Sequence, residues 1–431
     1  MKRILLIFIA LFFGYVSGLL SLFSQAGTLP TKIRRLTFSH NNKVIYSSIS
    51  ASGQYVIYVL EKNSGDKIQK SVRLLHIDSG KESGIFVEGN NGVKKPYGEG
   101  SLLIGSKPPL VSADGKTAIF ALSLGPPDNI LDHFLAVLKP GKGDIKVLSF
   151  PNVGLKEKDI SSLGFENPNW ERISHYAISH DGSRVTCVLK GHLGPRRFGN
   201  CSGIVLLDLD SGTRRFLLGP DFIDESWKCS SFPCNPLLGG GWAFSMSGNG
   251  QKVLFGAQSS EEQTDFDLYI ADWGSGRFMK ITKFNDRWFS LADIGFDGSQ
   301  VLFYYNGKKH RGIGTYRVNS DGSGLQYVES PCLPRIELYG ISGDGSAIYY
   351  KNVYQGMMMS LNSGVEFIIF KEKTPGYVRG VSPMDFPKSP AFWTPKTISL
   401  NGSRLLLFGP PMGRQSPEIY LLSIDNLKLR Q

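Results

Sequence analysis

Short runs of apolar residues, separated by polar turns that contain glycine, extend along almost the whole chain. Examples are YVIY at 55–58, VLF at 253–255 and LLLF at 405–408. β-Branched and aromatic residues fit a pleated strand better than a helix, and runs of this length are typical of strands. The pattern therefore predicts an all-β chain made of many short strands.

A four-residue motif recurs before these runs. It reads Ser or Gly, any residue, then Asp, Asn or Ser, then Gly. Asp-Gly and Asn-Gly form tight hairpin turns because both residues tolerate positive φ. The motif predicts a tight turn between two strands at each copy, and its seven copies begin at Ser50, Ser112, Ser179, Ser247, Gly295, Ser342 and Ser399.

A second turn follows in most copies, as in IDSG at 77–80, LDSG at 209–212 and WGSG at 273–276. Each unit is therefore expected to run strand, tight turn, strand, variable loop, strand, tight turn, strand. Four antiparallel strands that repeat every 47 to 68 residues predict the blade of a β-propeller, with insertions in the longer copies. The sequence thus predicts a seven-bladed β-propeller.

The unit of Ser-x-Asp-Gly, an Ile/Val-aromatic strand and a later strand ending in Asp-x-x-Gly resembles the WD40-like repeat of TolB-type β-propellers. The resemblance covers nearly all of the chain after its N-terminal segment, and seven copies in register make it specific. It implies a Gram-negative envelope setting. TolB itself has an α/β domain before its propeller, for which this sequence leaves no room, so the roles of that domain are not transferred.

One segment predicts how the ring closes. Residues 32–37 (KIRRLT) resemble the outermost strand of a blade, yet they precede the first motif. We expect this strand to pair with the last blade, because closure removes the two exposed edges that a linear array would leave. In the alternative, residues 427–429 (LKL) supply that outer strand alone.

Residues 1–26 have the parts of a secretory signal peptide. Lys2 and Arg3 precede an apolar run at 4–13, and Ser-Gln-Ala at 24–26 gives a small-residue exit. We assign 1–26 to the signal and 27–431 to the propeller, and expect a periplasmic or secreted monomer. If the signal is not cleaved, its apolar stretch is long enough to anchor the protein in a membrane.

The formal net charge of +11 favours anionic partners, such as an anionic polysaccharide. It is equally compatible with a basic protein whose charge serves solubility alone. Nucleic acid is not expected as a partner, because the export signal places the protein elsewhere.

Binding residues are expected on one face of the ring. The tight turns of each blade lie on one face, and the middle and blade-to-blade loops lie on the other. The insertions fall in the second set, at 125–132, 153–175, 191–201, 219–241 and 371–396. A scaffold with one plain face and one elaborated face usually binds through the elaborated one.

These loops supply residue types that anchor interfaces, and tryptophan can also stack on sugars. In the alternative, the tryptophans fill gaps between blades. A basic run at 308–311 (KKHR) either binds an anionic group or is a solvated hairpin tip. The candidate binding residues are Arg196, Arg197, Trp170, Trp227, Trp242 and Trp393.

The cysteines suit an oxidising compartment. Cys229 and Cys234 lie in one insertion and are candidates for a disulfide. Cys201 and Cys332 form a second candidate pair if their loops meet. Cys187 lies in a predicted strand and is expected to be a buried apolar residue.

Catalytic signals are poor. The chain has no Gly-x-Ser-x-Gly elbow, no Walker loop and no His-Glu-x-x-His. We therefore expect no cofactor, no metal site and a non-enzymatic scaffold that binds envelope proteins or peptides. Some TolB-like propellers are polysaccharide lyases with a histidine-held metal. The alternative is therefore a carbohydrate-active enzyme, lyase or hydrolase, metal-assisted or not, with its site at the channel mouth. A lyase would hold a divalent metal with ligands among His133, His175, His192 and His310.

Overall fold

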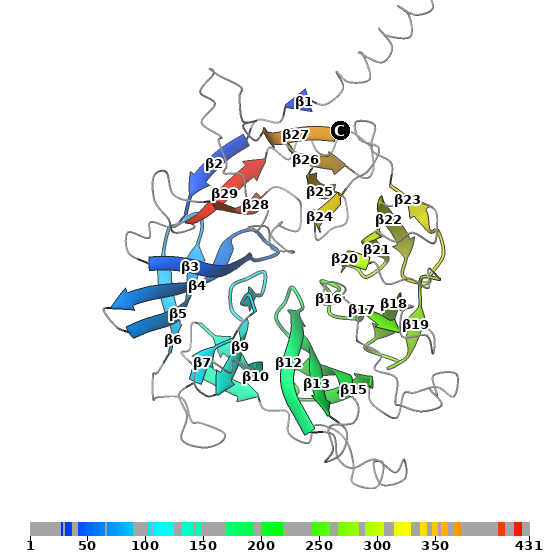
Figure 1. The fold of residues 1–431 in the computed structure, drawn as a ribbon, viewed down its shortest axis with the longest axis horizontal. Helices are drawn as coiled ribbons and strands as arrows, with labels where there is room; N and C mark the ends of the chain where they lie inside the picture. The colour runs from blue at the N-terminus through cyan, green and yellow to red at the C-terminus, as the bar shows by residue number, and fades with distance from the viewer. Residues whose placement is uncertain are drawn as a thin grey trace, which may run out of the picture.

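The computed structural model arranges its strands as seven sheets around a common centre (Figure 1). All statements below concern the residues that the structure describes. These are 27–28, 31–36, 42–64, 67–88, 102–105, 107–124, 132–140, 144–148, 169–192, 200–218, 244–258, 266–283, 289–305, 314–328, 337–342, 347–351, 355–360, 366–371, 404–409 and 418–424.

We number the sheets as blades 1 to 7 in chain order. Blade 1 holds β3 (Asn42–Ile49), β4 (Tyr55–Ser64), β5 (Lys67–His76) and β6 (Glu82–Val87). Blade 2 holds β7 (Leu102–Ile104), β8 (Leu110–Val111), β9 (Ala118–Leu124), β10 (Asp132–Lys139) and β11 (Asp144–Leu148). Blade 3 holds β12 (Asn169–Ile178), β13 (Arg184–His192), β14 (Asn200–Asp208) and β15 (Arg214–Leu218).

Blade 4 holds β16 (Phe244–Met246), β17 (Lys252–Gln258), β18 (Phe266–Asp272) and β19 (Phe278–Lys280). Blade 5 holds β20 (Phe289–Ile294), β21 (Gln300–Tyr305), β22 (Gly314–Asn319) and β23 (Gln326–Tyr327). Blade 6 holds β24 (Glu337–Ile341), β25 (Ala347–Lys351), β26 (Gln355–Ser360), β27 (Glu366–Lys371) and β1 (Gly27–Thr28). Blade 7 holds β28 (Arg404–Gly409), β29 (Glu418–Ile424) and β2 (Thr31–Arg35). The predicted all-β propeller of antiparallel blades is confirmed.

The core lies between neighbouring blades, and this explains the apolar runs. Along β4, Ile57 and Val59 face blade 2, where they pack with Phe120. Val56 and Tyr58 point to the other side, into the core that also contains Leu421 of blade 7. Because both faces of an inner strand are buried, the strand carries a run of consecutive apolar residues, such as 55–60 in β4, instead of alternating with polar residues. Each fully buried side chain of this kind stabilises the fold by about 1.5–3 kcal/mol.

The N-terminal strand closes the ring, as predicted. β2 pairs antiparallel with β29, with Thr31 opposite Ile424 and Arg35 opposite Tyr420. The observed strand begins one residue before the expected segment 32–37, and it ends two residues before the end of that segment. The alternative strand at 427–429 and the predicted signal at 1–26 lie outside the described residues. No helix among the described residues is long and apolar enough to cross a bilayer.

Several predicted loop insertions are shorter than expected, because the flanking strands extend into them. In blade 3, two residues that were expected in a loop lie in a strand. Trp170 and His175 belong to β12 and not to a loop. The pairing of β12 with β13 shifts register between Trp170 and Arg172 and again between Ile173 and His175. Such bulges break the period-two alternation that identifies a strand in a sequence.

Similar strand extensions occur elsewhere. Gly191 and His192 end β13, and Cys201 belongs to β14. His133 lies in β10, and Lys371 ends β27. The predicted loops at 125–132, 191–201 and 371–396 are therefore shortened by the strands that flank them.

Candidate functional site

The tight turns of the motif are built by their own side chains. In blade 3, the Ser179 hydroxyl accepts the backbone N–H of Arg184 at 2.9 Å and donates to the Asp181 carboxylate at 2.6 Å. That carboxylate accepts the backbone N–H of Ser183 at 3.0 Å. The motif glycine, Gly182, has a φ of +73°, which glycine adopts without steric cost. The same pattern recurs in blade 2 around Ser112 and in blade 4 around Ser247.

These hydrogen bonds hold the turn carboxylates in their charged form. The backbone N–H of Ser299 lowers the pKa of Asp297, and the Ser299 hydroxyl lowers it further by a smaller amount. The backbone N–H of Ser275 in the second turn of blade 4 likewise lowers the pKa of Asp272. The acidic residues of the motif therefore have a structural role that the turn geometry explains.

The turns of adjacent blades are also joined to one another through the backbone. The N–H of Ala113 in blade 2 donates to the carbonyl of His180 in blade 3, at 2.7 Å. The N–H of His180 donates to Gly248 in blade 4 at 2.8 Å, and Asn249 donates to Phe296 in blade 5 at 3.0 Å. The tight turns thus form a hydrogen-bonded chain from blade 2 to blade 5.

A second set of contacts comes from the residue two positions after each motif glycine. In blades 3, 4 and 7 this residue is Arg184, Lys252 or Arg404, and its cation donates to the carbonyl of the next blade's motif glycine, at 3.3, 3.1 and 2.7 Å. In blade 1, Tyr55 lies against the glycine of blade 2. We call these contacts the latches. The latches hold neighbouring blades together, and they occupy polar groups on the face that carries the tight turns.

Arg184 contacts two further groups besides the carbonyl of the next blade. Its guanidinium lies 5.0 Å from the centre of the Trp273 ring and 3.7 Å from the Asp208 carboxylate. Arg215 of the same blade donates to the carbonyl of Gly274 in blade 4 at 3.1 Å. Blades 3 and 4 are therefore joined at both of their tight turns.

The strand ends opposite the tight turns are where the predicted binding residues cluster in blade 3. His192 at the end of β13 pairs with both Asn169 and Asn200. Segment 193–199, which contains Arg196 and Arg197, lies outside the described residues, but it begins and ends at this edge. Trp170 pairs with Gly191 at the same edge. Of the six candidates, the described residues thus include Trp170 alone, at this edge of blade 3.

The remaining candidates lie outside the described residues, namely Trp227, Trp242, Trp393, the cysteines Cys229, Cys234 and Cys332, and the basic run at 308–311 with His310. Cys187 is confirmed as a fully buried residue of β13, and burial raises the pKa of its thiol. No group of three His, Cys, Asp or Glu side chains within the described segments is placed to hold a metal ion.

The innermost strands bring together side chains that the sequence analysis did not single out. The Tyr176 hydroxyl donates to the Pro108 carbonyl at 2.7 Å, and the Ser48 hydroxyl donates to the Pro109 carbonyl. These bonds hold the segment between β7 and β8 from both neighbouring blades. This segment carries Lys107, a half-buried cation for which the described residues supply no ion pair.

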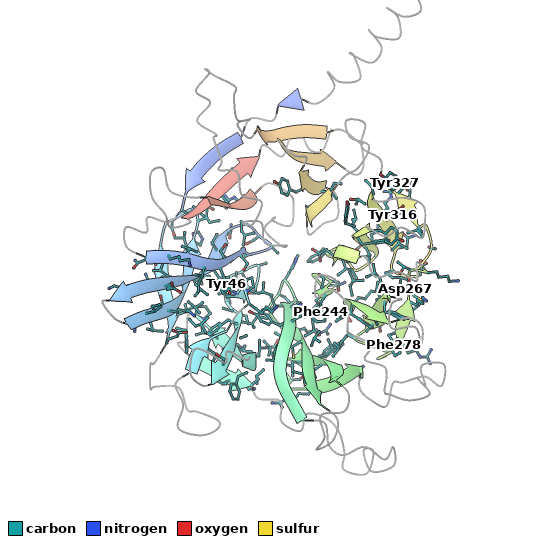
Figure 2. The ribbon with its side chains drawn as sticks, in the orientation of Figure 1. Tyr46, Phe244, Asp267, Phe278, Tyr316 and Tyr327 are labelled. Atoms are coloured by element: carbon teal, nitrogen blue, oxygen red, sulfur yellow. The ribbon has the colours of Figure 1, made fainter. Side chains whose placement is uncertain are left out.

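Further half-buried groups lie on the innermost strands of blades 3 to 5. The His175 and Phe244 rings are 6.1 Å apart, and Figure 2 shows Phe244 at the inner edge of blade 4. The Asp293 carboxylate accepts a hydrogen bond from Ser245. We call Lys107, His175, Phe244 and Asp293 the inner-wall group. The group combines a cation, an imidazole, an aromatic ring and a carboxylate, all half-buried, on the inner parts of blades 2 to 5.

The motif itself carried a signal for the inner-wall group. Because each motif begins where an innermost strand ends, the residues two to five positions before the motif lie on that strand or just before it. Lys107, His175, Phe244 and Asp293 all occupy these positions.

One buried carboxylate lies away from both regions. Asp267 is fully buried in β18, in the outer part of blade 4 (Figure 2). It accepts a hydrogen bond from the Thr282 hydroxyl at 2.8 Å and pairs with the Lys280 ammonium at 2.7 Å. Both partners belong to the strand that follows in the same blade or to the residues just after it, so the pair fastens the outer strand of the blade. Its role is structural.

No protein-family model matches this chain, and no curated protein matches it. Solved structures do. An oligogalacturonate lyase in complex with manganese is 12% identical and has a TM-score of 0.56, over 94% of this chain and 96% of that chain. An acylaminoacyl peptidase from Pyrococcus horikoshii is 13% identical with a TM-score of 0.50, over 90% of this chain and 52% of that one.

TolB from Acinetobacter baumannii is 14% identical, over 86% of this chain and 79% of that chain, with a TM-score of 0.39. At these identities a structural likeness shows the fold and leaves the activity open. The resemblance of the repeat to TolB-type propellers is thus supported at the level of fold: the chain is a β-propeller of the kind that the lyase also adopts.

Proposed function

We propose that this protein is an exported, non-enzymatic scaffold that binds an envelope protein or peptide through the face opposite the tight turns. The proposal rests on the hydrogen bonding of the turn face, which is the face of the ring that carries the tight turns. There, backbone groups and latch cations of successive blades bond to one another, as in the bond from Ala113 to His180 and from Arg404 to Gly53. Groups already engaged within the ring are poor donors and acceptors for a partner.

The opposite face supplies the recognition chemistry. Trp170 and both ends of the segment with Arg196 and Arg197 meet at one edge of blade 3. Arginine and tryptophan are the residue types that most often anchor protein interfaces. The net charge of +11 favours a partner with an acidic surface and accelerates its association.

The signal-like residues 1–26 support an extracytoplasmic setting for this binding. The resemblance of the repeat to TolB-type propellers points to the same compartment. A rigid ring with loops at one end suits a partner that presents a peptide segment to the loops or to the inner-wall group.

A carbohydrate-active enzyme is the second candidate. The likeness to an oligogalacturonate lyase extends over 94% of this chain, and His175 and Asp293 of the inner-wall group are of the types that act as acids, bases or metal ligands. Cleavage of an anionic polysaccharide by the purified protein, dependent on added divalent metal and lost in His175→Ala, would favour this candidate over the scaffold.

The scaffold proposal is tested by cross-linking in the native cell, followed by mass spectrometry of the proteins captured with the full chain. We expect a defined envelope protein with the wild type. The charge-reversed double variant Arg196→Glu/Arg197→Glu should reduce capture by at least about tenfold, because removal of an arginine anchor typically costs 2 kcal/mol or more.

The matched control is Lys81→Glu/Lys116→Glu, which makes the same change in charge on the turn face, where both side chains are exposed. This control should capture the partner as the wild type does. Equal losses in the two double variants would show that net charge alone governs capture, and that result would contradict binding through the loop face.

A further inference from the structure

The N-terminal segment crosses the junction between two blades. β1 adds to the outer edge of blade 6 in parallel, with Gly27 opposite Phe367 and Thr28 opposite Ile368. After two intervening residues, β2 adds to the outer edge of blade 7. Leu36 then packs against the core between blades 7 and 1. We call residues 27–28 and 31–36 the strap; Figure 1 shows β1 beside β27 and β2 beside β29.

The latch residues differ in whether their side chains can donate a hydrogen bond to the next blade. Arg184, Lys252 and Arg404 donate to a carbonyl of the next blade. Thr117 of blade 2 lies against the glycine of blade 3, and Gln300 of blade 5 has an amide that can donate. At the same position blade 6 has Ala347, which is buried and whose methyl group has no donor. The junction of blades 6 and 7 is therefore the one whose latch position carries the shortest side chain.

We propose that the strap holds blades 6 and 7 together, and that the ring opens at the junction between them when the strap detaches. The strap spans the same junction at which the latch position is an alanine. Its two strands are short, with two and five residues, and each is the outermost strand of its sheet. An edge strand of this length separates at a lower free-energy cost than an inner strand that is paired on both sides.

Detachment would have a defined structural consequence. β27 and β29 would become edges with unpaired backbone groups, and such edges accept extended strands from other chains. Leu36 would leave the core it shares with Leu421. The strap thus controls whether blades 6 and 7 form part of a closed ring, independently of any ligand.

The test is hydrogen exchange of the native full-length protein, read by peptide mass spectrometry, in the variant Ile33→Pro. Ile33 pairs with Leu422 at the middle of β2, and proline disrupts the ladder there by removing its N–H and fixing φ. We expect amide exchange to accelerate at least about tenfold in β26 to β29, with little change in blades 2 to 5. Ile33→Gly, which keeps the N–H but weakens the strand, should give the same pattern with a smaller acceleration.

The matched control is Phe216→Pro, which places proline at the middle of β15, the outermost strand of blade 3. Exchange should then rise in β14 and β15 alone, because the Arg184 latch between blades 3 and 4 lies outside β15 and remains. The proposal is overturned if Ile33→Pro accelerates exchange in β29 but leaves blade 6 unchanged, or if all blades accelerate equally.

Discussion

Replacement of Gly182 by alanine is expected to lower the free energy of unfolding by about 2–5 kcal/mol. The backbone φ of +73° disfavours any side chain, at a cost of about 1–2 kcal/mol. An added Cβ would also lie 2.7 Å from Thr117 Oγ1 and 2.8 Å from Ser112 Cβ, both in blade 2. Overpacking of such a contact adds roughly 1–3 kcal/mol. Urea denaturation followed by fluorescence measures the loss.

Gly212→Ala is the matched control for this prediction. Gly212 has a nearly equal φ of +70° but nothing within 4 Å of an added Cβ. It should therefore lose only the conformational part, about 1–2 kcal/mol. The difference between the two variants isolates the contact between blades 2 and 3. Equal losses would mean that the motif glycines serve the turn alone and that they do not set the distance between blades.

Arg184→Ala is expected to lower the free energy of unfolding by about 2–3 kcal/mol. The variant loses the hydrogen bond to the Gly250 carbonyl, the packing on the Trp273 ring and the pairing with Asp208. A charged hydrogen bond contributes about 1.5–3 kcal/mol and a partly exposed cation–π contact about 0.5–1 kcal/mol, and these terms are not fully additive. Thermal denaturation should show the loss as a lower midpoint.

Arg317→Ala serves as its control. Arg317 is more exposed and donates to Gln326 Oε1 within blade 5, at 2.9 and 2.6 Å. An exposed pair inside one blade should cost less than about 1 kcal/mol when it is broken. If both arginine variants lose the same amount, the latch between blades 3 and 4 contributes no more than an ordinary surface contact.

The fold was predictable because the repeat encodes it locally. Each motif supplies a turn that only a few residue types can form, and five of the seven motif glycines have the expected positive φ. The two other motif glycines, Gly345 and Gly402, lie outside the described residues. The closing strand was also visible, since an outer-strand sequence before the first motif has no other blade to join. The first part of β12 was assigned to a loop because its two bulges remove the alternation of a strand.

The candidate site was less accessible to sequence reasoning. The latches join residues that are 66 and 351 positions apart, as in Arg184 with Gly250 and Arg404 with Gly53. Such contacts depend on the angle between blades, and a linear sequence does not express that angle. Lys107, Phe244 and Asp293 of the inner-wall group were missed for a related reason: the motif placed them on or just before innermost strands, but only the ring brings those strands around one axis.

The central claim is that partners bind at the loop face and that the turn face holds the ring together. Site-specific photo-cross-linking in the native cell tests it most directly, with a photoreactive amino acid at position 196 in one strain and at position 210 in another. Asp210 is an exposed residue in the second tight turn of the same blade. The account predicts a covalent adduct with a defined envelope protein from position 196 and none from position 210. An adduct from position 210 alone would contradict it.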